Sequence, residues 1–591
     1  MQIPASEGRK YGEKDKNLFD FLEKFNKFLG IKRPPTYLGG CFLKIAVYFL
    51  SIRLFLLNFA SVILNYKIMR GRITFIVLAF LAVSCAKESL GTGRGLDYTY
   101  GRELPHDKIV LGDRLENPYT TENMTKALQS LYPTKADRVD VKTTHLYVRF
   151  LPRTEQEYDI LNSLDLAMTD HPLDYDIVVE GDWYHDPAVP EGEVTWQYAV
   201  VPPDFEFPDI RYEIIDECYI SENDPATRAD GIDWEAVERE SYVLTGNADR
   251  LATPVKGPSK VQPEGRITIE DEQFNGGKPF GVAGVRISCN SFVKFDHATT
   301  DRDGYFKMEK SFSSKLRYRL VFENEKGFSI GLNLVLVPAS VSTLGRTEPT
   351  GVNMTITKDS DDKLFRRCVV NNAAYEYFSR CNLKDLGLAP PPSDLRIWIF
   401  HKLSASSAVM LHHGALLSQK DLKEFLGDYA DLVSFFLPDI TIGAASSQDY
   451  SRLYSSTVHE LAHASHFTKV GTDYWNKYIL YIVRSFLESR DMTYGDGTGL
   501  SSGYCEIGEM WAYYLESRFF KDRYGGPFPT FGTSYWFYPQ IFRFLDERGM
   551  KASQIFSVLR DNVTSRPALK EALMTSYPDK RTMVEQVFSR Y

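Results

Sequence analysis

The sequence predicts a multidomain protein in which an α/β region, an all-β region and a mainly helical α+β region follow one another. The chain has 591 residues, enough for three or more domains of about 150 residues each. Its hydrophobic fraction of 43% and charged fraction of 25% are those of a globular protein. The spacing of its apolar residues changes to strand alternation near residue 262 and to helical spacing near residue 346. These two changes divide the folded part of the chain into three regions.

The charge balance argues against a nucleic-acid partner. Lys and Arg number 69 and Asp and Glu number 78, a net charge of −9, whereas a protein that binds nucleic acid needs a basic face. The 7 cysteines are widely spaced and include no CxxC pair, so neither a cysteine zinc site nor a disulfide scaffold is expected. For Cys368 and Cys381 two alternatives stay open, namely a disulfide in an oxidising compartment or two buried free thiols.

Residues 69–84 have the three parts of a secretory signal peptide. A basic start is followed by the apolar run 73–83, which is too short to span a bilayer, and by small residues before Cys85. The four residues that end in Cys85 (Ala-Val-Ser-Cys) resemble the lipobox of bacterial lipoproteins, although Leu is more usual in place of the Ala. The resemblance implies cleavage before Cys85, a lipid anchor on Cys85, and a polar tether over residues 85–110. It places the protein in a bacterial cell envelope, at the outer membrane or the cell surface.

Two interpretations stay open for residues 1–68. In the first, Met69 is the physiological start and residues 1–68 are an upstream extension. In the second, the apolar stretch 41–64 is a transmembrane helix. Lys44 and Arg53 interrupt that stretch, and each costs about 3 kcal/mol inside a membrane span, which favours the first interpretation.

Residues 111–255 form the α/β region, which suits a small accessory or propeptide-like domain. Residues 143–152 alternate like a strand, 155–164 have helical spacing, and 173–178 are extended again. This pattern predicts a strand–helix–strand unit and carries no catalytic signal. Residues 256–265 are spotted with Pro, Gly and charged residues, which indicates a linker.

Residues 262–345 have an all-β pattern. Strands are expected at 266–269, 284–289, 305–308 and 318–322. The Asp-Gly pair at 303–304 predicts a hairpin turn. The region resembles the carboxypeptidase regulatory-like (transthyretin-like) family, which implies a β-sandwich with a structural or adhesive role and no catalysis. The residues that carry the resemblance are Gly265, Ile267, Val282, Gly284, Val285, Ile287 and residues 300–306 without Arg302.

Residues 346–591 have mainly helical spacing. Helices are expected at 364–381, 421–429 and about 448–467, and strands at 395–400 and 435–443. The last of these helices follows directly on the second strand and carries the chemistry of the chain.

His459, Glu460 and His463 form a His-Glu-x-x-His motif on that helix. Residues four apart lie on one face of a helix, so both imidazoles can bind one metal ion. Zinc hydrolysis needs such nitrogen ligands, an open coordination position and a carboxylate that takes a proton from water. The pattern turns up by chance in roughly one chain in a hundred of this length, so other residues must support it. The alternative is a buried helix whose histidines only form internal hydrogen bonds.

His466 is not expected to be the third ligand. It lies about 10.5 Å from His459 along a straight helix, whereas zinc–nitrogen bonds are about 2.1 Å long. The metzincin pattern also fails, because it requires Gly where this chain has His466 and His where it has Lys469. His466 is therefore expected at the rim of the site or on the surface.

A later helix, residues 506–516, offers the third ligand. Glu506, Glu509 and Tyr513 lie on one of its faces. A carboxylate from this helix would complete a site of two histidines and one glutamate, and the spacing allows either Glu506 or Glu509.

The motif helix and this later helix resemble the two zinc helices of gluzincin-type metallopeptidases. In that family the ligand Glu is followed three residues later by Ala, and Glu509 with Ala512 matches this. The resemblance implies a zincin-like domain with His459, His463 and Glu509 as the ligands of Zn²⁺.

The same resemblance implies how a peptide or protein substrate would be cleaved. Zinc-bound water would attack the peptide carbonyl, and Glu460 would take its proton as general base. The strand at 435–443 would be an edge strand that pairs with the extended substrate. Tyr513, Tyr535, Tyr538, His412 and His413 are available to stabilise the oxyanion, and the sequence does not choose among them.

The sequence therefore predicts a secreted, lipid-anchored zinc metallopeptidase. One alternative concerns the function of the whole chain, and another concerns the role of residues 111–255. The chain could instead be a non-catalytic surface adhesin or a glycan- or peptide-uptake accessory lipoprotein with a vestigial zinc site. The β-sandwich and the aromatic content of 14% favour that reading. Separately, residues 111–255 could inhibit or chaperone the peptidase.

Overall fold

The structure is a computed structural model, and it describes most of the chain from residue 108 to residue 591. The residues left out within that span are 135, 137–138, 165, 191–193, 224–230, 254–259, 332–340, 360–361, 384–385, 401–405, 416–437, 446–448 and 490–493. The expected signal peptide with Cys85, the segment 1–68 and the helix at 421–429 lie outside the described residues. No helix in the described part of the chain is long and apolar enough to cross a membrane.

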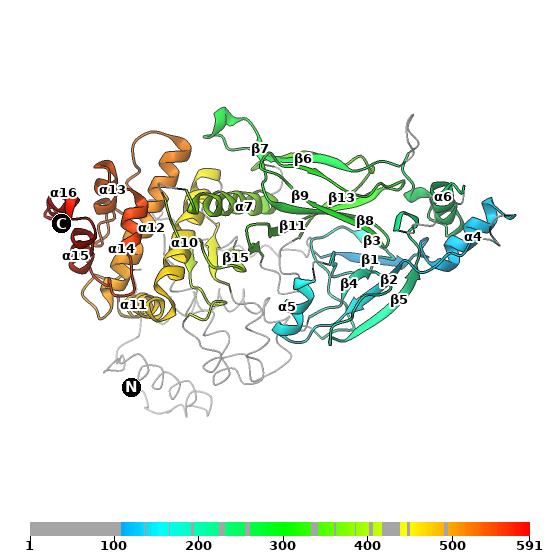
Figure 1. Ribbon diagram of the computed structural model, residues 1–591, viewed down its shortest axis with the longest axis horizontal. Helices are drawn as coiled ribbons and strands as arrows, with labels where there is room; N and C mark the ends of the chain where they lie inside the picture. Colours follow the sequence, from blue (N-terminus) through cyan, green and yellow to red (C-terminus); the bar gives the residue numbers. More distant parts are fainter. Residues whose placement is uncertain are drawn as a thin grey trace, which may run out of the picture.

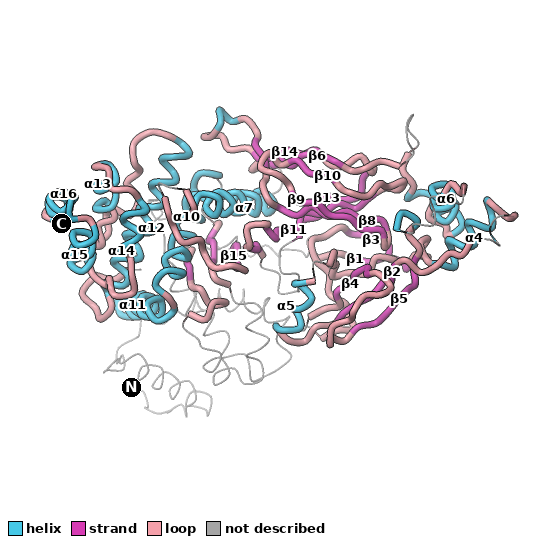
Figure 2. Tube along the Cα trace, in the orientation of Figure 1, coloured by secondary structure: helices cyan, strands magenta, loops and turns pink. Residues whose placement is uncertain are grey.

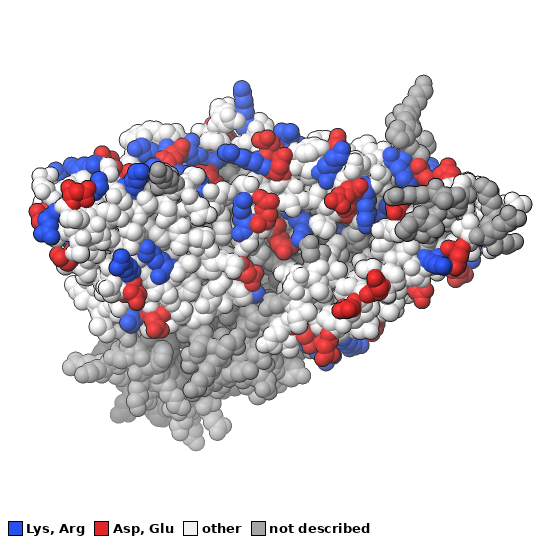
Figure 3. Space-filling view, in the orientation of Figure 1, with Lys and Arg blue, Asp and Glu red and all other residues white. Residues whose placement is uncertain are grey.

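The described chain is a mixed α/β structure with several sheets and a helical C-terminal part. Strands gather in one half of the molecule and the C-terminal helices form the other (Figures 1 and 2). Charged side chains of both signs are interspersed over the described part of the face in Figure 3.

The first region contains two small sheets flanked by helices. Its elements are β1 (Val110–Arg114), α4 (Thr121–Leu131), β2 (His145–Phe150), α5 (Glu155–Ser163), β3 (Tyr175–Val179), β4 (Gln197–Val201), β5 (Tyr212–Cys218) and α6 (Trp234–Leu244). The expected strand, helix and strand are all present as β2, α5 and β3. However, β2 lies in the sheet β4-β2-β5, whereas β3 pairs with β1, so the three elements do not form one unit.

The second region consists of two sheets that share one core. Its strands are β6 (Glu264–Ile269), β7 (Phe280–Gly281), β8 (Val285–Ser291), β9 (Lys294–Thr299), β10 (Tyr305–Lys307), β11 (Leu316–Asn324), β12 (Phe328–Ile330), β13 (Val341–Thr347) and β14 (Asn353–Ile356). All four expected strands are present, as β6, β8, β10 and β11. Fully buried Ile267 of the smaller sheet and Ile287 and Leu320 of the larger one belong to one hydrophobic cluster. The strands run past residue 345, where the sequence placed the end of this region, because β14 pairs with β6.

The expected hairpin at residues 303–304 is wrong. The turn forms, with Gly304 at φ +77°, but β9 pairs with β8 and β10 pairs with β6. The reason is that Gly304 lies against β6, where its carbonyl accepts a hydrogen bond from Ile267 N at 2.9 Å. A Cβ at position 304 would lie 2.0 Å from the Ile267 oxygen, so only Gly allows the chain to cross between sheets here.

The larger sheet continues into the C-terminal region. The elements of that region are α7 (Asp362–Cys381), β15 (Leu395–Phe400), β16 (Ser407–Ala408), β17 (Ile440–Gly443), α10 (Tyr450–Val470), α11 (Thr472–Ser489), α12 (Ser502–Tyr524), α13 (Gln540–Glu547), α14 (Ala552–Val558), α15 (Arg566–Ser576) and α16 (Arg581–Phe588). The strand order β16-β17-β15-β12-β11-β8-β9 joins both regions, because β12 pairs in parallel with β15.

The sheet order changes the expectation for an edge strand. The described end of the expected strand at 435–443 is β17, which pairs with β15 on one side and β16 on the other. It is therefore an inner strand, and β16 is the outer one in the described sheet. Both β16 and β17 contact α10, so the sheet supports the helix that carries the motif.

Helix α10 is the central element of the C-terminal region and is buried along nearly its whole length. It packs against α7, α11 and α12. Gly471 ends it in a left-handed conformation (φ +79°), and α11 begins at once. Cys368 and Cys381 are both buried. They lie on one helix, α7, about 20 Å apart along its axis, which excludes a disulfide between them.

Candidate metal centre

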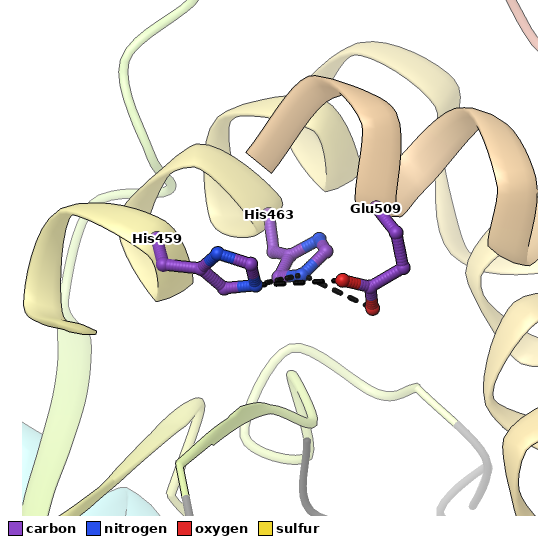
Figure 4. A group of neighbouring side chains, drawn as sticks. All are labelled: His459, His463 and Glu509. Carbon is purple, nitrogen blue, oxygen red and sulfur yellow. Dashed lines mark hydrogen bonds and ion pairs between the residues drawn. The ribbon is translucent and has the colours of Figure 1, made fainter. Parts of the chain in front are cut away.

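Two histidines of α10 and one glutamate of α12 point at one another (Figure 4). The Nε2 atoms of His459 and His463 lie 3.1 Å apart. Glu509 Oε2 is 3.5 Å from His459 Nε2, and Glu509 Oε1 is 3.5 Å from His463 Nε2. Helices α10 and α12 thus bring together the three side chains that the sequence proposed as ligands.

The spacing of these atoms fits a tetrahedral metal ion. Three ligand atoms about 2.0–2.1 Å from one ion, at tetrahedral angles, lie about 3.3–3.4 Å apart. The separations of 3.1, 3.5 and 3.5 Å lie on either side of that value, with the two longer ones running to different oxygens of the Glu509 carboxylate. One ligand atom from each of the three residues lies within 4.8 Å of the others. Two histidine nitrogens and a carboxylate are also the donor set of many catalytic zinc sites. The residues present therefore fit Zn²⁺.

Glu516 orients the first of these histidines. Its Oε2 lies 3.1 Å from Nδ1 of His459, and Ser455 Oγ donates a hydrogen bond to its other oxygen. Because a carboxylate accepts, Nδ1 of His459 carries a hydrogen, and in the neutral ring this leaves the lone pair on Nε2, which faces His463. The two Nε2 atoms lie 3.1 Å apart, a distance at which two lone pairs repel each other unless a cation or a proton lies between them. Glu516 was missed in the sequence, where its only signal is its position two helical turns after Glu509.

Aromatic side chains wall the cluster. Tyr478 of α11 donates a hydrogen bond to Glu509 Oε1 at 2.5 Å. The ring of Trp475 lies 5.6 Å from that of His463, and the ring of Tyr513 lies 4.4 Å from that of His459. These contacts fix the rotamers of the imidazoles and exclude water from behind them.

Burial and charge act in opposite directions on these groups. Burial lowers the pKa of His459, but its hydrogen bonds with Glu509 and Glu516 outweigh this and raise that pKa to about 10. Burial raises the pKa of Glu509, but the positive potential of His463 and His459 brings that pKa well below its usual range. The pKa of His463 is lowered, mainly by burial. The pocket therefore favours positive charge between the imidazoles and the carboxylate.

Glu460 lies beside the cluster with its side chain buried. It is 2% exposed, and its charge contributes to the raised pKa of His459. Glu460, Glu509 and Glu516 place three carboxylates around two imidazoles in a water-poor interior. Buried charge needs compensation, and a divalent cation at the cluster would balance two of these three negative charges.

Glu506, the alternative ligand, is held elsewhere. Its Oε1 lies 2.9 Å from Arg566 Nε, and its Oε2 accepts a hydrogen bond from Arg566 N at 3.0 Å. One helical turn separates Glu506 from Glu509, and this turn is enough to direct them to different partners. The geometry selects Glu509 as the carboxylate of the cluster.

The expectation that His466 lies at the rim or on the surface is wrong. His466 is fully buried, with its ring 5.2 Å from that of Tyr474 and 6.1 Å from that of Trp475. Burial lowers its pKa to about 3, so the ring is neutral at pH 7. It is a core residue, because α11 folds back over this end of α10.

Two of the tyrosines considered for the oxyanion, Tyr535 and Tyr538, lie in different surroundings. The ring of Tyr535 is 5.9 Å from that of Tyr513, which itself contacts His459. Tyr538 packs instead against Tyr591, at 5.2 Å, near the C-terminus. Tyr535 is thus the one that is connected to the cluster through another ring.

Comparison with known proteins adds no family. No family model matches the chain, and no curated protein matches it. Among solved structures, that titled "Crystal structure of (S)-allantoin synthase" aligns with 22% of this chain and 50% of its own, at 15% sequence identity and a TM-score of 0.12. A TM-score this low supports no statement about fold or function.

Proposed function

We propose that the chain is a zinc-dependent metallopeptidase of gluzincin type that hydrolyses peptide bonds. The observation that carries the proposal is the convergence of His459, His463 and Glu509 at separations that fit one tetrahedral ion. Glu516 supports it, because ligand histidines commonly donate their second ring nitrogen to a carboxylate.

Each residue of the cluster has a distinct role in this proposal. A bound zinc ion would supply Lewis acidity, which lowers the pKa of water toward neutrality and polarises a carbonyl group. Glu460 accepts the proton that the attacking water loses and passes it to the leaving amine. Glu516 holds the tautomer of His459, and Tyr478 fixes the carboxylate of Glu509. The aromatic walls keep bulk water away from these charges.

The remaining parts of the chain complete the proposal as the sequence suggested them. Residues 69–84 would export the protein, Cys85 would anchor it to the bacterial envelope, and residues 262–345 would be a carboxypeptidase regulatory-like sandwich. The region 111–255 would be an accessory domain. The described two-sheet core is compatible with such a sandwich, and the substrate would be a peptide or protein outside the cytoplasm.

Metal content together with activity tests the proposal. We expect about one zinc ion per chain after purification without chelator, and cleavage of a peptide library that stops when the metal is removed. Glu460→Gln should keep the zinc and lose cleavage, whereas His463→Ala should lose both. Glu506→Gln, on the same helix but paired with Arg566, is the matched control and should keep both.

The outcomes separate this function from its rival. Stoichiometric zinc without hydrolysis of any peptide would support a non-catalytic surface protein with a vestigial site. Absence of zinc, or full activity in Glu460→Gln, would overturn the metallopeptidase proposal.

A further inference from the structure

A second polar cluster lies far from the metal centre in sequence, on one face of the large sheet. Along β11, Tyr318 and Leu320 point into the hydrophobic core, so Arg317 and Arg319 lie on the opposite face. Arg286 shares that face on β8. Residues 162, 166–171 and 181–182 of the first region lie across a cavity from this face.

The cavity is small and has a cationic inner end. Water-sized molecules can reach about 50 Å³ of it. One water needs about 10–15 Å³, so the space suits a group of roughly three to five non-hydrogen atoms. Arg317 is 2% exposed, Arg319 is 5% exposed and Phe295 is 6% exposed, so all three belong to its buried lining. The rest of the lining consists of other buried residues, such as His171, and half-buried ones, such as Asn162.

The guanidinium of Arg317 already has partners within the protein. Its Nε and Nη2 lie 3.0 and 2.8 Å from Glu180 Oε2. Its Nη1 donates to His171 Nε2 at 2.7 Å, and Nδ1 of the same ring donates to Asp170 at 2.9 Å. Burial lowers the pKa of His171 to about 4, so this ring is neutral and relays a hydrogen bond without adding charge.

Arg319 has no such partner within the described residues. Its Nη2 donates to Asn290 Oδ1 at 3.1 Å, and its guanidinium lies 5.8 Å from the Phe295 ring centre. Its Nε is buried and makes no hydrogen bond, and no carboxylate in the described chain lies within ion-pair distance. Asp170 and Glu180 act on this guanidinium only from beyond ion-pair distance, so its buried, unused N–H calls for a closer acceptor. Burial, with Arg317 nearby, lowers the pKa of Arg319 to about 9, which expresses the cost of burying its charge.

The carboxylates that line the cavity have partners other than Arg319. Glu323 pairs with Arg286, Asp182 with Arg367, and Asp170 with His171. Arg319 therefore retains a buried N–H for which the described chain offers no acceptor.

We propose that this cavity is a binding site for a small oxyanion, a carboxylate or phosphate group, held by Arg319. The guanidinium offers its buried Nε–H to such a group, and charge-assisted hydrogen bonds of this kind are stronger than neutral ones. The apolar wall of Leu166, Phe295 and Val341 leaves room for a short apolar extension of a carboxylate. Because the walls come from both the first region and the large sheet, a bound anion ties these two parts of the chain together.

Titration of the full chain with simple anions tests this site. Acetate, propionate and phosphate are each added at constant ionic strength against sodium chloride, and thermal unfolding and calorimetric binding are followed. We expect at least one of them to bind at one saturable site and to raise the unfolding temperature beyond the chloride control. Binding of the carboxylates alone identifies a carboxylate site, and binding of phosphate alone identifies a phosphate site.

Substitutions place the binding at Arg319. Arg319→Gln should weaken it at least about tenfold, since a hydrogen bond to a charged group is lost. Arg319→Lys should retain part of it, because the cation remains. Arg266→Gln, an exposed arginine on β6, is the matched control and should bind as the unaltered chain does. If no oxyanion acts on the unaltered chain beyond chloride, or if its effect persists in Arg319→Gln, the assignment is wrong.

Discussion

Replacing Glu516 by Gln separates a zinc site from a cluster of hydrogen-bonded histidines. The exchange keeps the volume of the side chain and an oxygen that can accept from His459 Nδ1, but it removes the negative charge. Glu516 is fully buried and touches His459 at 3.1 Å, so no solvent can replace the lost charge. If Glu516 acts by making His459 a better ligand, its effect must appear in metal affinity.

The size of the effect follows from the contact. A hydrogen bond to a charged group contributes about 1.5–3 kcal/mol, and a neutral acceptor retains roughly half of this. The expected loss for Glu516→Gln is about 0.8–1.5 kcal/mol, or about four- to tenfold in zinc affinity. For Glu516→Leu, which removes the acceptor, the loss should approach about a hundredfold, the upper end for residues that orient metal ligands.

Competition with a chromophoric zinc chelator at fixed pH measures these affinities. The control is Glu506→Gln on the same helix, whose carboxylate is paired with Arg566 and does not touch the histidines. The reasoning is refuted if Glu516→Gln binds zinc as tightly as the control variant does. A parallel melting curve without metal checks that both variants are folded.

Three further substitutions test other parts of the structure. The free energy of unfolding of the wild type should fall as the pH drops from about 6.5 toward 3, by up to about 1.4 kcal/mol per pH unit, because unfolding lets His466 take a proton. His466→Leu should lack this component in urea titrations at pH 7 and pH 5. Gly532→Ala should destabilise the folded protein by about 2–4 kcal/mol and weaken zinc binding, because Gly532 has a φ of +67° and an added Cβ would lie 2.5 Å from the Tyr513 side chain. An unchanged melting temperature would contradict this. Glu238→Gln should lower the free energy of unfolding by up to about 3 kcal/mol, because it leaves buried Lys294 with less counter-charge. Chemical denaturation measures this, and an unchanged free energy would argue against a stabilising Glu238–Lys294 pair.

The large sheet supports the candidate metal centre. Strand β12 pairs with β15, so the sheet that forms the core of the second region extends beneath α10. Apolar residues of both regions form one cluster, which includes Ile287 of β8 and Leu461 of the motif helix. Because packed cores transmit small displacements, substitutions in the core of the second region should shift the positions of His459 and His463.

Local patterns in the sequence were enough for most elements near the site. Helical spacing predicted α7, the motif helix and α12, and strand alternation predicted β6, β8, β11 and β15. The spacing of His459 and His463 placed both on one face of a helix, and the family resemblance pointed to Glu509. The predicted elements and the shared helix face are short-range properties, which depend on periods of 2.0 and 3.6 residues.

Long-range pairing was beyond those patterns. The sequence predicts the turn at Gly304, but the chain crosses between two sheets there because β10 pairs with β6. In the same way, β17 has the composition of a strand, and only its partners make it an inner strand.

The sequence by itself determined that two histidines and a glutamate form a motif and that a second helix carries candidate ligands. Only the tertiary structure decided between Glu506 and Glu509, showed that His466 is buried, and placed Glu516 behind His459. It also left a buried N–H of Arg319 without an acceptor in the described part of the chain. The physical reason is common to all of these. A helix or strand fixes which side chains share a face, but the partner that each buried charge meets is set by elements distant in the chain.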